Sequence, residues 1–372
     1  MSSHRSLAIA EVSVRSLRNL ARVDVAPSPR LNVVSGDNGQ GKTSLLEALY
    51  LACTTRSFRA TRLRELVGHG AEAGSVRLRV DEGGEAREQT VGLDARGVRR
   101  VMLDGKRPAT HAAYAVRTPV VVFHPGDLAL SAGPAAGRRT LLDRVGLFVD
   151  PSSLDHASRW TEASRSRQRA LEDRGTSAPD LDAFEHLMGL HGAALTRVRA
   201  EAARRLAAEA GPAFAAITRG AREVALAYEP GGSDDASELT ERLAATRERD
   251  RHRGSASVGP GRDDLAVALD ARAARSEASQ GEHRALTLAL KLAELACIRH
   301  ARGVEPVLLL DDVSSELDPG RTEALFGLLG AETGQIFLTT TRPDLIVAPG
   351  GGADRRLDLR LSAGAVVGAS GG

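Results

Sequence analysis

The stretch VVSGDNGQGKTSLLEALYLA, residues 33 to 52, places glycines, a lysine and a threonine where together they could bind phosphate. An apolar strand precedes the glycines and an apolar helix follows them. Residues 36–43 match the pattern G-x-x-x-x-G-K-[ST] without a mismatch, and its glycines let backbone N–H groups curl around phosphates. The helix that begins there adds the positive end of its dipole. The pattern therefore predicts a nucleoside triphosphate site.

We expect this loop to bind ATP with Mg²⁺, with Lys42 reaching the β- and γ-phosphates and the Thr43 hydroxyl ligating the metal. Only three of the 50 basic residues are lysines, so the choice of lysine at position 42 stands out. Lys42 is therefore predicted to be catalytic as well as nucleotide-binding. The expected nucleotide-binding residues of the loop are Gly36, Asp37, Asn38, Gly39, Gln40, Gly41, Lys42, Thr43 and Ser44.

An acidic partner for the metal follows much later, in the stretch VLLLDD at residues 307 to 312. Its four apolar residues predict a central strand, and Asp311 lies at the carboxyl end of that strand, where ligands bind in such sheets. We expect Asp311 to hold Mg²⁺ and Asp312 to orient or deprotonate the attacking water. The alternative for Asp312 is that it only caps the following turn.

A second candidate anion site lies just before this strand, in SQGEHRAL at residues 279 to 286. A serine and a glycine at the start of a helix favour anion binding. One nucleotide does not need two phosphate sites in one chain. We therefore expect Ser279, Gln280 and Gly281 to contact the nucleotide of a second copy, so that ATP would join two subunits. The alternative is that Ser279 caps its helix without a ligand.

Alternating and continuous apolar runs predict a mixed α/β unit over residues 1–148. Its expected elements are strands within 7–34, a helix over 43–53, an antiparallel meander over 74–107 and a buried strand within 119–127.

The chain changes character at about residue 149. Residues 149–256 are rich in Ala, Arg and Glu and predict long helices, either packed as an all-α subdomain or extended as a short antiparallel coiled coil. Residues 257–264 resemble a linker that leads back to α/β sequence, so 257–362 is expected to complete the first unit. Residues 363–372 are of low complexity and are predicted to be disordered.

Composition limits the other functions. The chain has 372 residues and a net charge of only +2, so any nucleic-acid surface must be a local patch. Arg56, Arg59, Arg62 and Arg64 form such a candidate patch for DNA phosphates, and a solvated surface is the alternative. Aromatic residues make up only 3%, which favours backbone contacts over base stacking. No signal peptide or long apolar span is evident, so we expect a cytoplasmic protein without a membrane segment.

The order of these motifs is that of ABC-type ATPase heads, and more narrowly it resembles the RecF family of bacterial recombination mediators. The resemblance covers residues 7 to 345. The blocks that carry it are NVVSGDNGQGKTSLLEALYLA, PGDLALSAGPAAGRRTLLD, GPGRDD, SQGEHR, LLLDDVSSELD and FLTTT.

The resemblance implies an α/β ABC-ATPase head with P-loop mixed sheets and an inserted, mainly helical lobe. It also implies a weak, DNA-stimulated ATPase that dimerises on ATP and binds duplex DNA at gaps and ss/dsDNA junctions. RecR, with RecO, is the implied partner in loading recombinase during DNA repair. By position, Arg18 and Asn19 match the segment near the adenine, residues 315–318 match the D-loop, and Thr341 falls near the switch position.

This sequence departs from the family pattern at Glu282 and His283, where glutamines are usual, and we expect the Glu282 side chain to point away from the anion site. Two other functions remain alternatives. An SMC-like structural DNA tether would need longer arms than this chain holds. A P-loop phosphotransferase acting on a small substrate would not need the second anion site at the start of the helix at 279–286. It would work as a monomer without DNA.

Overall fold

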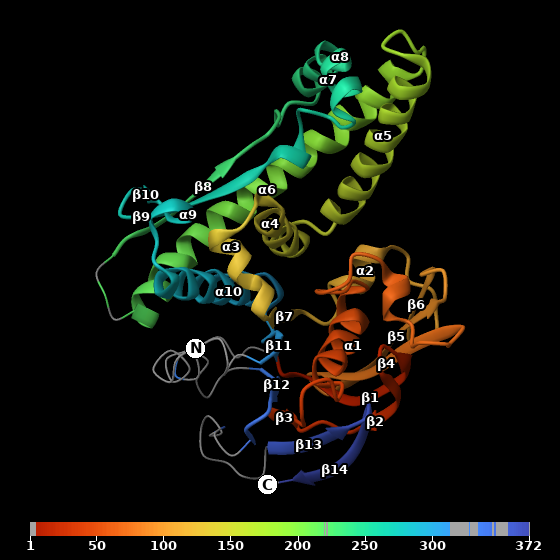
Figure 1. The fold of residues 1–372 in the computed structure, drawn as a ribbon, viewed down its shortest axis with the longest axis vertical. Helices are drawn as coiled ribbons and strands as arrows, with labels where there is room; N and C mark the ends of the chain where they lie inside the picture. The colour runs from red at the N-terminus through yellow and green to blue at the C-terminus, as the bar shows by residue number, and fades with distance from the viewer. Residues whose placement is uncertain are drawn as a thin grey trace. The chain divides into compact units, whose positions relative to one another are not determined.

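A computed structural model describes residues 5–218, 220, 222–312, 327, 334–343, 346 and 356–371, which divide into two compact units (Figure 1). Unit 1 comprises Met1–Asp127 and Ile298–Gly372, and unit 2 comprises Leu128–Cys297. The predicted insert, 149–256, lies wholly within unit 2. Unit 2 is wider than this insert because the segments on either side of it pack onto the same helices. Residues 315–318, which match the D-loop by position, lie outside the described residues.

Unit 1 contains a six-stranded sheet in the order β14-β13-β3-β12-β11-β7. The five strands from β13 to β7 are parallel, and β14 is added antiparallel at the edge. Strands β7, β11 and β12 are buried along their whole length, as expected for apolar strands inside a parallel sheet. The strands are β3 Leu31–Ser35, β7 Val120–Phe123, β11 Val307–Leu310, β12 Ile336–Thr340, β13 Arg356–Ser362 and β14 Ala365–Gly371.

A five-stranded antiparallel sheet in the order β2-β1-β4-β5-β6 completes unit 1 and confirms the predicted meander. Its strands alternate buried apolar and outward polar residues, which is the pattern of a sheet covered on one face. The remaining elements of unit 1 are β1 Leu7–Leu17, β2 Leu20–Val25, α1 Lys42–Thr54, η1 Leu63–Leu66, β4 Ala73–Glu82, β5 Glu85–Asp94, β6 Arg99–Leu103, α2 His111–Ala115 and η2 Pro125–Leu128, whose last residue belongs to unit 2.

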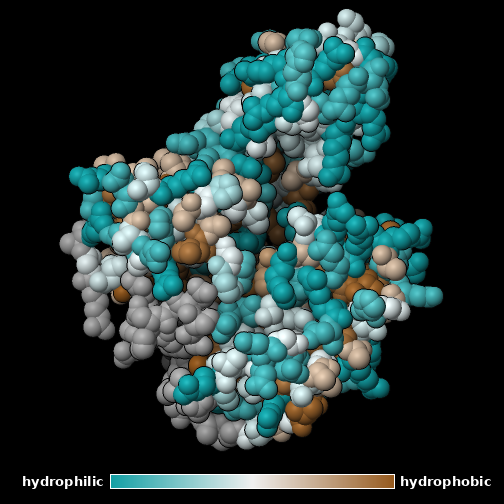
Figure 2. Space-filling model, viewed as in Figure 1, coloured by the Kyte–Doolittle hydropathy of each residue, from teal (hydrophilic) through white to brown (hydrophobic). Residues whose placement is uncertain are grey.

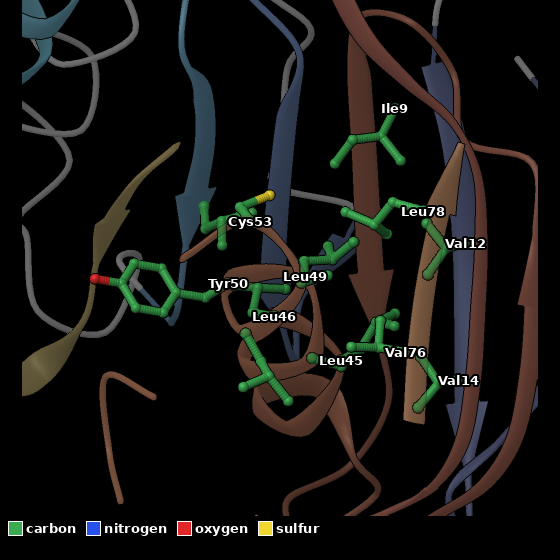
Figure 3. Packing of buried hydrophobic residues seen from close by; sticks show 14 of the residues in the cluster. Ile9, Val12, Val14, Leu45, Leu46, Leu49, Tyr50, Cys53, Val76 and Leu78 are labelled. Carbon is green, nitrogen blue, oxygen red and sulfur yellow. The ribbon is translucent and has the colours of Figure 1, made fainter. Parts of the chain in front are cut away.

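Helix α1 is the centre of the unit 1 core. In Figure 3, Leu45 and Leu49 of the helix lie on the side of strands β1 and β4, which contribute Ile9, Val12, Val14, Val76 and Leu78, whereas Tyr50 extends away from these strands. Each fully buried leucine of this kind contributes about 1.5–3 kcal/mol. The core therefore fixes the helix that begins at Lys42, and with it the glycine loop.

Unit 2 is built on α6, a helix of 38 residues. It packs against α4, α5, α7 and β8, so the helical insert is a packed subdomain and not a free two-helix coiled coil. Gly192 permits a close approach, because a Cβ there would lie 2.6 Å from the Trp160 ring. The helices are α3 Ala129–Ala132, α4 Ala135–Val149, α5 Ser153–Arg174, α6 Leu181–Thr218, α7 Ala236–Ala245, α8 Arg247–Arg253, α9 Ala274–Glu277 and α10 Gln280–Arg302, whose last turn belongs to unit 1.

The insert is not all-α, as one interpretation of the sequence expected, because it contains strand β8 Val224–Glu229. This strand is part of a three-stranded antiparallel sheet with β9 Asp264–Leu269 and β10 Arg272–Ala273. Strands β9 and β10 lie in the range 257–362, which was expected to complete the first unit, but they belong to unit 2. The β8 and β9 strands pair across a long intervening segment, which local sequence does not reveal.

Residues 257–264 are not a linker. Val258 and Pro260 are buried, and a 3₁₀ turn follows at Pro260–Arg262. The fully buried Asp263 accepts bonds from Arg199, Tyr228 and the Gly231 N–H. This aspartate ties the segment to α6 and to the end of β8, so its polar composition reflects a buried network and not flexibility.

The prediction that residues 363–372 are disordered is also wrong. Residues 365–371 form β14, which pairs with β13. Backbone hydrogen bonds to β13 do not require apolar side chains, so a Gly- and Ala-rich sequence can supply this edge strand.

Hydrophilic side chains dominate the visible surface over α5, α7 and α8 (Figure 2). Among the described residues, no helix is both long and apolar enough to cross a membrane.

Candidate nucleotide site

The glycine loop connects β3 to α1, and its backbone requires glycine at two points. Gly36 has a φ of 147°, and a Cβ there would lie 2.4 Å from the Leu361 carbonyl oxygen. Gly41 has a φ of 107°, directly before the first helical residue, Lys42. These left-handed conformations are accessible to glycine without strain, which explains why the motif needs glycine at both positions.

Polar side chains hold the loop in shape from inside. The Lys42 ammonium donates to the carbonyl oxygens of Gly36, at 2.6 Å, and Asp37, at 2.9 Å. The Asn19 amide donates to the Gly39 carbonyl oxygen at 2.9 Å and accepts from the Ser44 hydroxyl at 2.8 Å. Asn19, predicted near the base of a nucleotide, therefore lies against the loop itself.

Two threonines converge on the acidic residue at the end of β11. The Thr43 hydroxyl donates to Asp311 Oδ1 at 2.8 Å, and the Thr339 hydroxyl donates to the same oxygen at 2.9 Å. A hydroxyl and a carboxylate are the hard oxygen ligands that Mg²⁺ takes from a protein when phosphates and waters complete its shell. The residues present therefore fit the expected Mg²⁺, with Thr43 and Asp311 as its protein ligands.

Asp312 follows in a left-handed conformation, with a φ of 51°. Aspartate tolerates this conformation better than most residues. The Asp312 N–H donates to the Thr339 hydroxyl at 2.9 Å, so the residue is anchored to β12 through its backbone. Asp312 also lines the pocket described next, which is where its predicted role with water requires it.

A pocket of about 410 Å³ lies over these groups within unit 1. It brings the glycine loop, the start of α1, and the ends of β11 and β12 to one cavity. Its lining residues are Arg18, Asn19, Asn38, Gly39, Gly41, Lys42, Thr43, Ser44, Arg59, Asp312 and Thr339. Thr339 was not foreseen from the sequence, where Thr341 was chosen; Thr341 is exposed and follows the end of β12.

A buried carboxylate organises one rim of the pocket. Glu47 in α1 is 1% exposed and accepts two bonds from the Arg18 guanidinium, at 2.9 and 3.0 Å. This pairing raises the pKa of Arg18. Arg59 lies 3.9 Å from the same carboxylate, and Ser57 donates to it. The sequence does not predict Glu47 as a site residue, and its only signal is an acidic residue within the apolar run that follows Ser44.

The four arginines predicted for DNA are therefore not equivalent. All four are exposed, but Arg59 lines the pocket, while Arg56, Arg62 and Arg64 do not. We therefore group Arg59 with the pocket and keep Arg56, Arg62 and Arg64 as the candidate DNA patch.

The supposedly disordered tail contributes to this site. In the turn between β13 and β14, the Ala363 N–H donates to the Gln40 side chain and the Gly364 N–H to the Gln40 carbonyl oxygen at 3.1 Å. Gly364 has a φ of 77°, and a Cβ there would lie 1.8 Å from the Asn19 carbonyl oxygen. The C-terminal hairpin thus packs directly on the glycine loop.

Ser279, Gln280 and Gly281 lie at the start of α10 in unit 2, as predicted, and Ser279 and Gln280 are exposed. The Glu282 side chain does not point away from this helix start. Its Oε2 accepts from both the N–H and the hydroxyl of Ser279, each at 2.8 Å. The reason is a capping box, in which a glutamate three residues into a helix bonds back to the residue that caps it.

Comparison with known proteins agrees with this arrangement. Residues 8–349 match the family described as the RecF/RecN/SMC N terminal domain. The chain is 44% identical to the DNA replication and repair protein RecF of an Anaeromyxobacter species, over 93% of this chain and 95% of that protein. It is 38% identical to the protein of the same name from Myxococcus xanthus, over 95% of each chain.

Solved structures show the same likeness. One described as the recombination mediator protein RecF-ATP in the RecFOR pathway has a TM-score of 0.86 at 25% identity, covering 98% of each chain. An Smc head domain from Pyrococcus furiosus, bound to a domain of ScpA, has a TM-score of 0.56 at 15% identity, covering 98% of this chain and 96% of that one. The second likeness concerns the fold alone.

Proposed function

This chain belongs to the RecF family, and from that premise we propose that it is an ATP-dependent DNA-binding mediator of recombinational repair. The observation that carries the proposal is the convergence of Lys42, Thr43, Asp311 and Asp312 from the glycine loop and the end of β11, with a pocket of about 410 Å³ over them. A solved relative named RecF-ATP supports ATP as the nucleotide.

In this proposal each side chain has one task during hydrolysis of ATP to ADP and phosphate. Lys42 leaves the carbonyls of its own loop to bind the β- and γ-phosphates, which replaces weak neutral acceptors by strong anionic ones. Thr43 and Asp311 would hold Mg²⁺, which would neutralise phosphate charge. Asp312 orients the attacking water and accepts its proton. Thr339 fixes both aspartates, because its hydroxyl bonds to Asp311 and to the Asp312 backbone.

We propose that Ser279, Gln280 and Gly281 act on the nucleotide of a second copy. These residues are at the start of a long helix, and Ser279 and Gln280 are exposed. A two-fold dimer would place Ser279, Gln280 and Gly281 of each copy against the pocket of the other copy, so that two ATP molecules join two chains. Hydrolysis then separates them.

DNA is the proposed partner of this dimer. The exposed Arg56, Arg62 and Arg64 follow α1 closely in sequence, and Arg59 of the same segment is held at the pocket rim near Glu47. Guanidinium groups bind phosphate oxygens in a planar, bidentate manner. The segment is therefore suited to contact a duplex backbone, and Arg59 links that contact to the nucleotide pocket, which it lines.

The remaining roles follow from the relatives. One solved relative is described within the RecFOR pathway, which supports RecR and RecO as partners in loading recombinase. We propose that the target is duplex DNA beside a single-stranded gap, the ss/dsDNA junction at which such loading starts.

The experiment that tests this function is steady-state ATP hydrolysis with and without gapped duplex DNA. We expect slow hydrolysis that rises with DNA and that disappears in Lys42→Ala and in Asp312→Asn. Hydrolysis that is indifferent to DNA, with a monomeric enzyme that phosphorylates a small molecule, would instead identify a phosphotransferase.

A further inference from the structure

In the first turn of α10, the Glu282 carboxylate accepts hydrogen bonds from Ser279. The N–H and hydroxyl of Ser279 are the donors that the proposed dimer needs for the partner's nucleotide. Glu282 Oε2 accepts from the Ser279 N–H and from the Ser279 hydroxyl, both at 2.8 Å, and the Glu282 N–H donates back to that hydroxyl at 3.3 Å. The hydrogen bond from the Ser279 N–H, and after it the bond from the Ser279 hydroxyl, lower the pKa of Glu282. The group therefore carries a full negative charge at neutral pH.

The other oxygen of Glu282 has a separate partner. Arg222, in the segment before β8, donates through one terminal nitrogen to Glu282 Oε1 and through Nε to Asp270 Oδ2 at 2.7 Å. The Glu282 and Arg222 side chains are 26% and 41% exposed. Glu282 thus has one oxygen on Ser279 and one on an arginine that is itself held by Asp270.

We propose that Glu282 is an internal competitor of the γ-phosphate, which sets how much ATP is needed to join two copies. This inference rests on the proposed role of Ser279 at the partner's nucleotide. A carboxylate and a phosphate are both anions, and they compete for the same N–H and hydroxyl. The partner's nucleotide must therefore displace Glu282 Oε2 before it can bind Ser279.

Arg222 makes this displacement reversible. Because Arg222 bonds to Oε1 and not to the oxygen on Ser279, the carboxylate can leave Ser279 and keep a cationic partner. The device is a two-position carboxylate and requires no unfolding of the helix.

Glu282→Gln separates the charge from the helix cap. Glutamine has the same shape, can also accept from Ser279, and is a normal partner in a capping box. It removes the negative charge beside the incoming phosphate and, with it, the partly exposed ion pair to Arg222, which Asp270 still holds. With one such charge removed at each of two partly exposed sites, we expect the nucleotide-dependent dimer to tighten about tenfold.

The test is sedimentation of the full-length chain over a concentration series with Mg²⁺ and the slowly hydrolysed analogue ATPγS. Glu277→Gln is the matched control. Glu277 is an exposed glutamate of α9, two residues before Ser279, and its substitution by glutamine removes the same charge. We expect a lower dimer Kd for E282Q, an unchanged one for E277Q, and equal thermal stability for all three proteins.

Each other outcome overturns the inference in a distinguishable way. If the wild-type chain dimerises and E282Q has the same Kd, Glu282 is only a helix cap. If E277Q tightens as much as E282Q, the effect is general charge and not competition at Ser279. If the wild-type chain stays monomeric with ATPγS and Mg²⁺, the proposed dimer fails, and this inference fails with it.

Discussion

Unit 1 and unit 2 each bring charged motif residues together, but they do so in opposite surroundings. In unit 1, Lys42 and Asp312 line the nucleotide pocket and are held by backbone groups and hydroxyls. In unit 2, Arg167 is 1% exposed and donates to Glu185, Asp250 and the Leu243 carbonyl oxygen. Lys42 is 8% exposed yet faces a cavity, whereas Arg167 is enclosed on all sides by its partners. What distinguishes a charge that can bind a ligand is therefore a cavity beside it and not exposure as such.

The family-specific blocks illustrate this difference. Arg138 belongs to PGDLALSAGPAAGRRTLLD, one of the blocks that carry the resemblance to the RecF family, yet it donates both ends of its guanidinium to Asp264, at 2.7 and 2.8 Å, and is 5% exposed. Arg139 donates to the Asp263 carbonyl oxygen. These two arginines and the GPGRDD block are parts of one structural network, so a family-specific motif need not mark a ligand site.

The largest effect is expected in unit 2, from Arg167→Ala. Removing this guanidinium leaves the Glu185 and Asp250 carboxylates without their buried partner, which costs about 3–5 kcal/mol. The only tryptophan, Trp160, is in the same unit, so its fluorescence during urea unfolding measures this loss. Arg159→Ala on the same helix removes an exposed ion pair with Asp155 and should cost less than about 0.5 kcal/mol. Equal losses would contradict the contrast between buried and exposed charges.

The next effect is expected in the pocket, from Lys42→Ala. Losing a charge-assisted bond to phosphate should weaken ATP binding by about 10- to 100-fold. The Trp160 unfolding curve should not move, because Lys42 belongs to unit 1 and Trp160 packs in a core of unit 2. Titration with a fluorescent ATP analogue measures the binding. Unchanged affinity would show that the pocket does not hold the phosphates.

A smaller effect is expected from Gly364→Ala, behind the pocket. The substitution combines a left-handed backbone with a Cβ 1.8 Å from the Asn19 carbonyl oxygen, and a misplaced Asn19 disturbs the glycine loop. We expect a loss of about 1–3 kcal/mol in unfolding and weaker ATP binding. Gly83→Ala is the control, since Gly83 has a similar φ of 64° but no atom within 4 Å. If both variants bind ATP equally well, the hairpin does not support the loop.

The smallest effect concerns the pH dependence of unit 2. His191 Nδ1 is 2.9 Å from His156 Nδ1, and burial, followed by the nearby His156 and Arg159, lowers the pKa of His191. The unfolded chain then binds the proton more readily, so stability falls as the pH drops below about 6.5. Urea midpoints from Trp160 fluorescence at pH 8 and pH 5.5 measure this loss. His191→Gln should reduce the loss, whereas the exposed His186→Gln should leave it unchanged; an equal loss in all three proteins would exclude His191.

Much of unit 1 follows from local pattern alone. The loop pattern predicts the strand before Gly36 and the helix from Lys42, and four apolar residues predict β11 and the position of Asp311. What the sequence cannot show is pairing between distant segments. Thr339 joins the site through the register of β12 beside β3 and β11, and Gly364 joins it through a hairpin whose residues look disordered in isolation.

The polar clusters of unit 2 are hard to predict for the same reason. The sequence of residues 257–264 is polar and glycine-rich, which is typical of a linker. Its true environment depends on Arg199 and Asp143, which come from two different helices. Only the packed fold brings these charges together, so their burial becomes visible only with the structure.

The measurement that tests the central proposal most directly is the mass of Asp312→Asn in solution with ATP, Mg²⁺ and gapped duplex DNA. This variant should bind ATP normally without hydrolysing it, so size-exclusion chromatography with light scattering should detect two copies of the 39.2 kDa chain on each DNA. The same sample without ATP should contain free monomer. A variant that remains monomeric with ATP and DNA would contradict the proposal that ATP joins two copies of this chain.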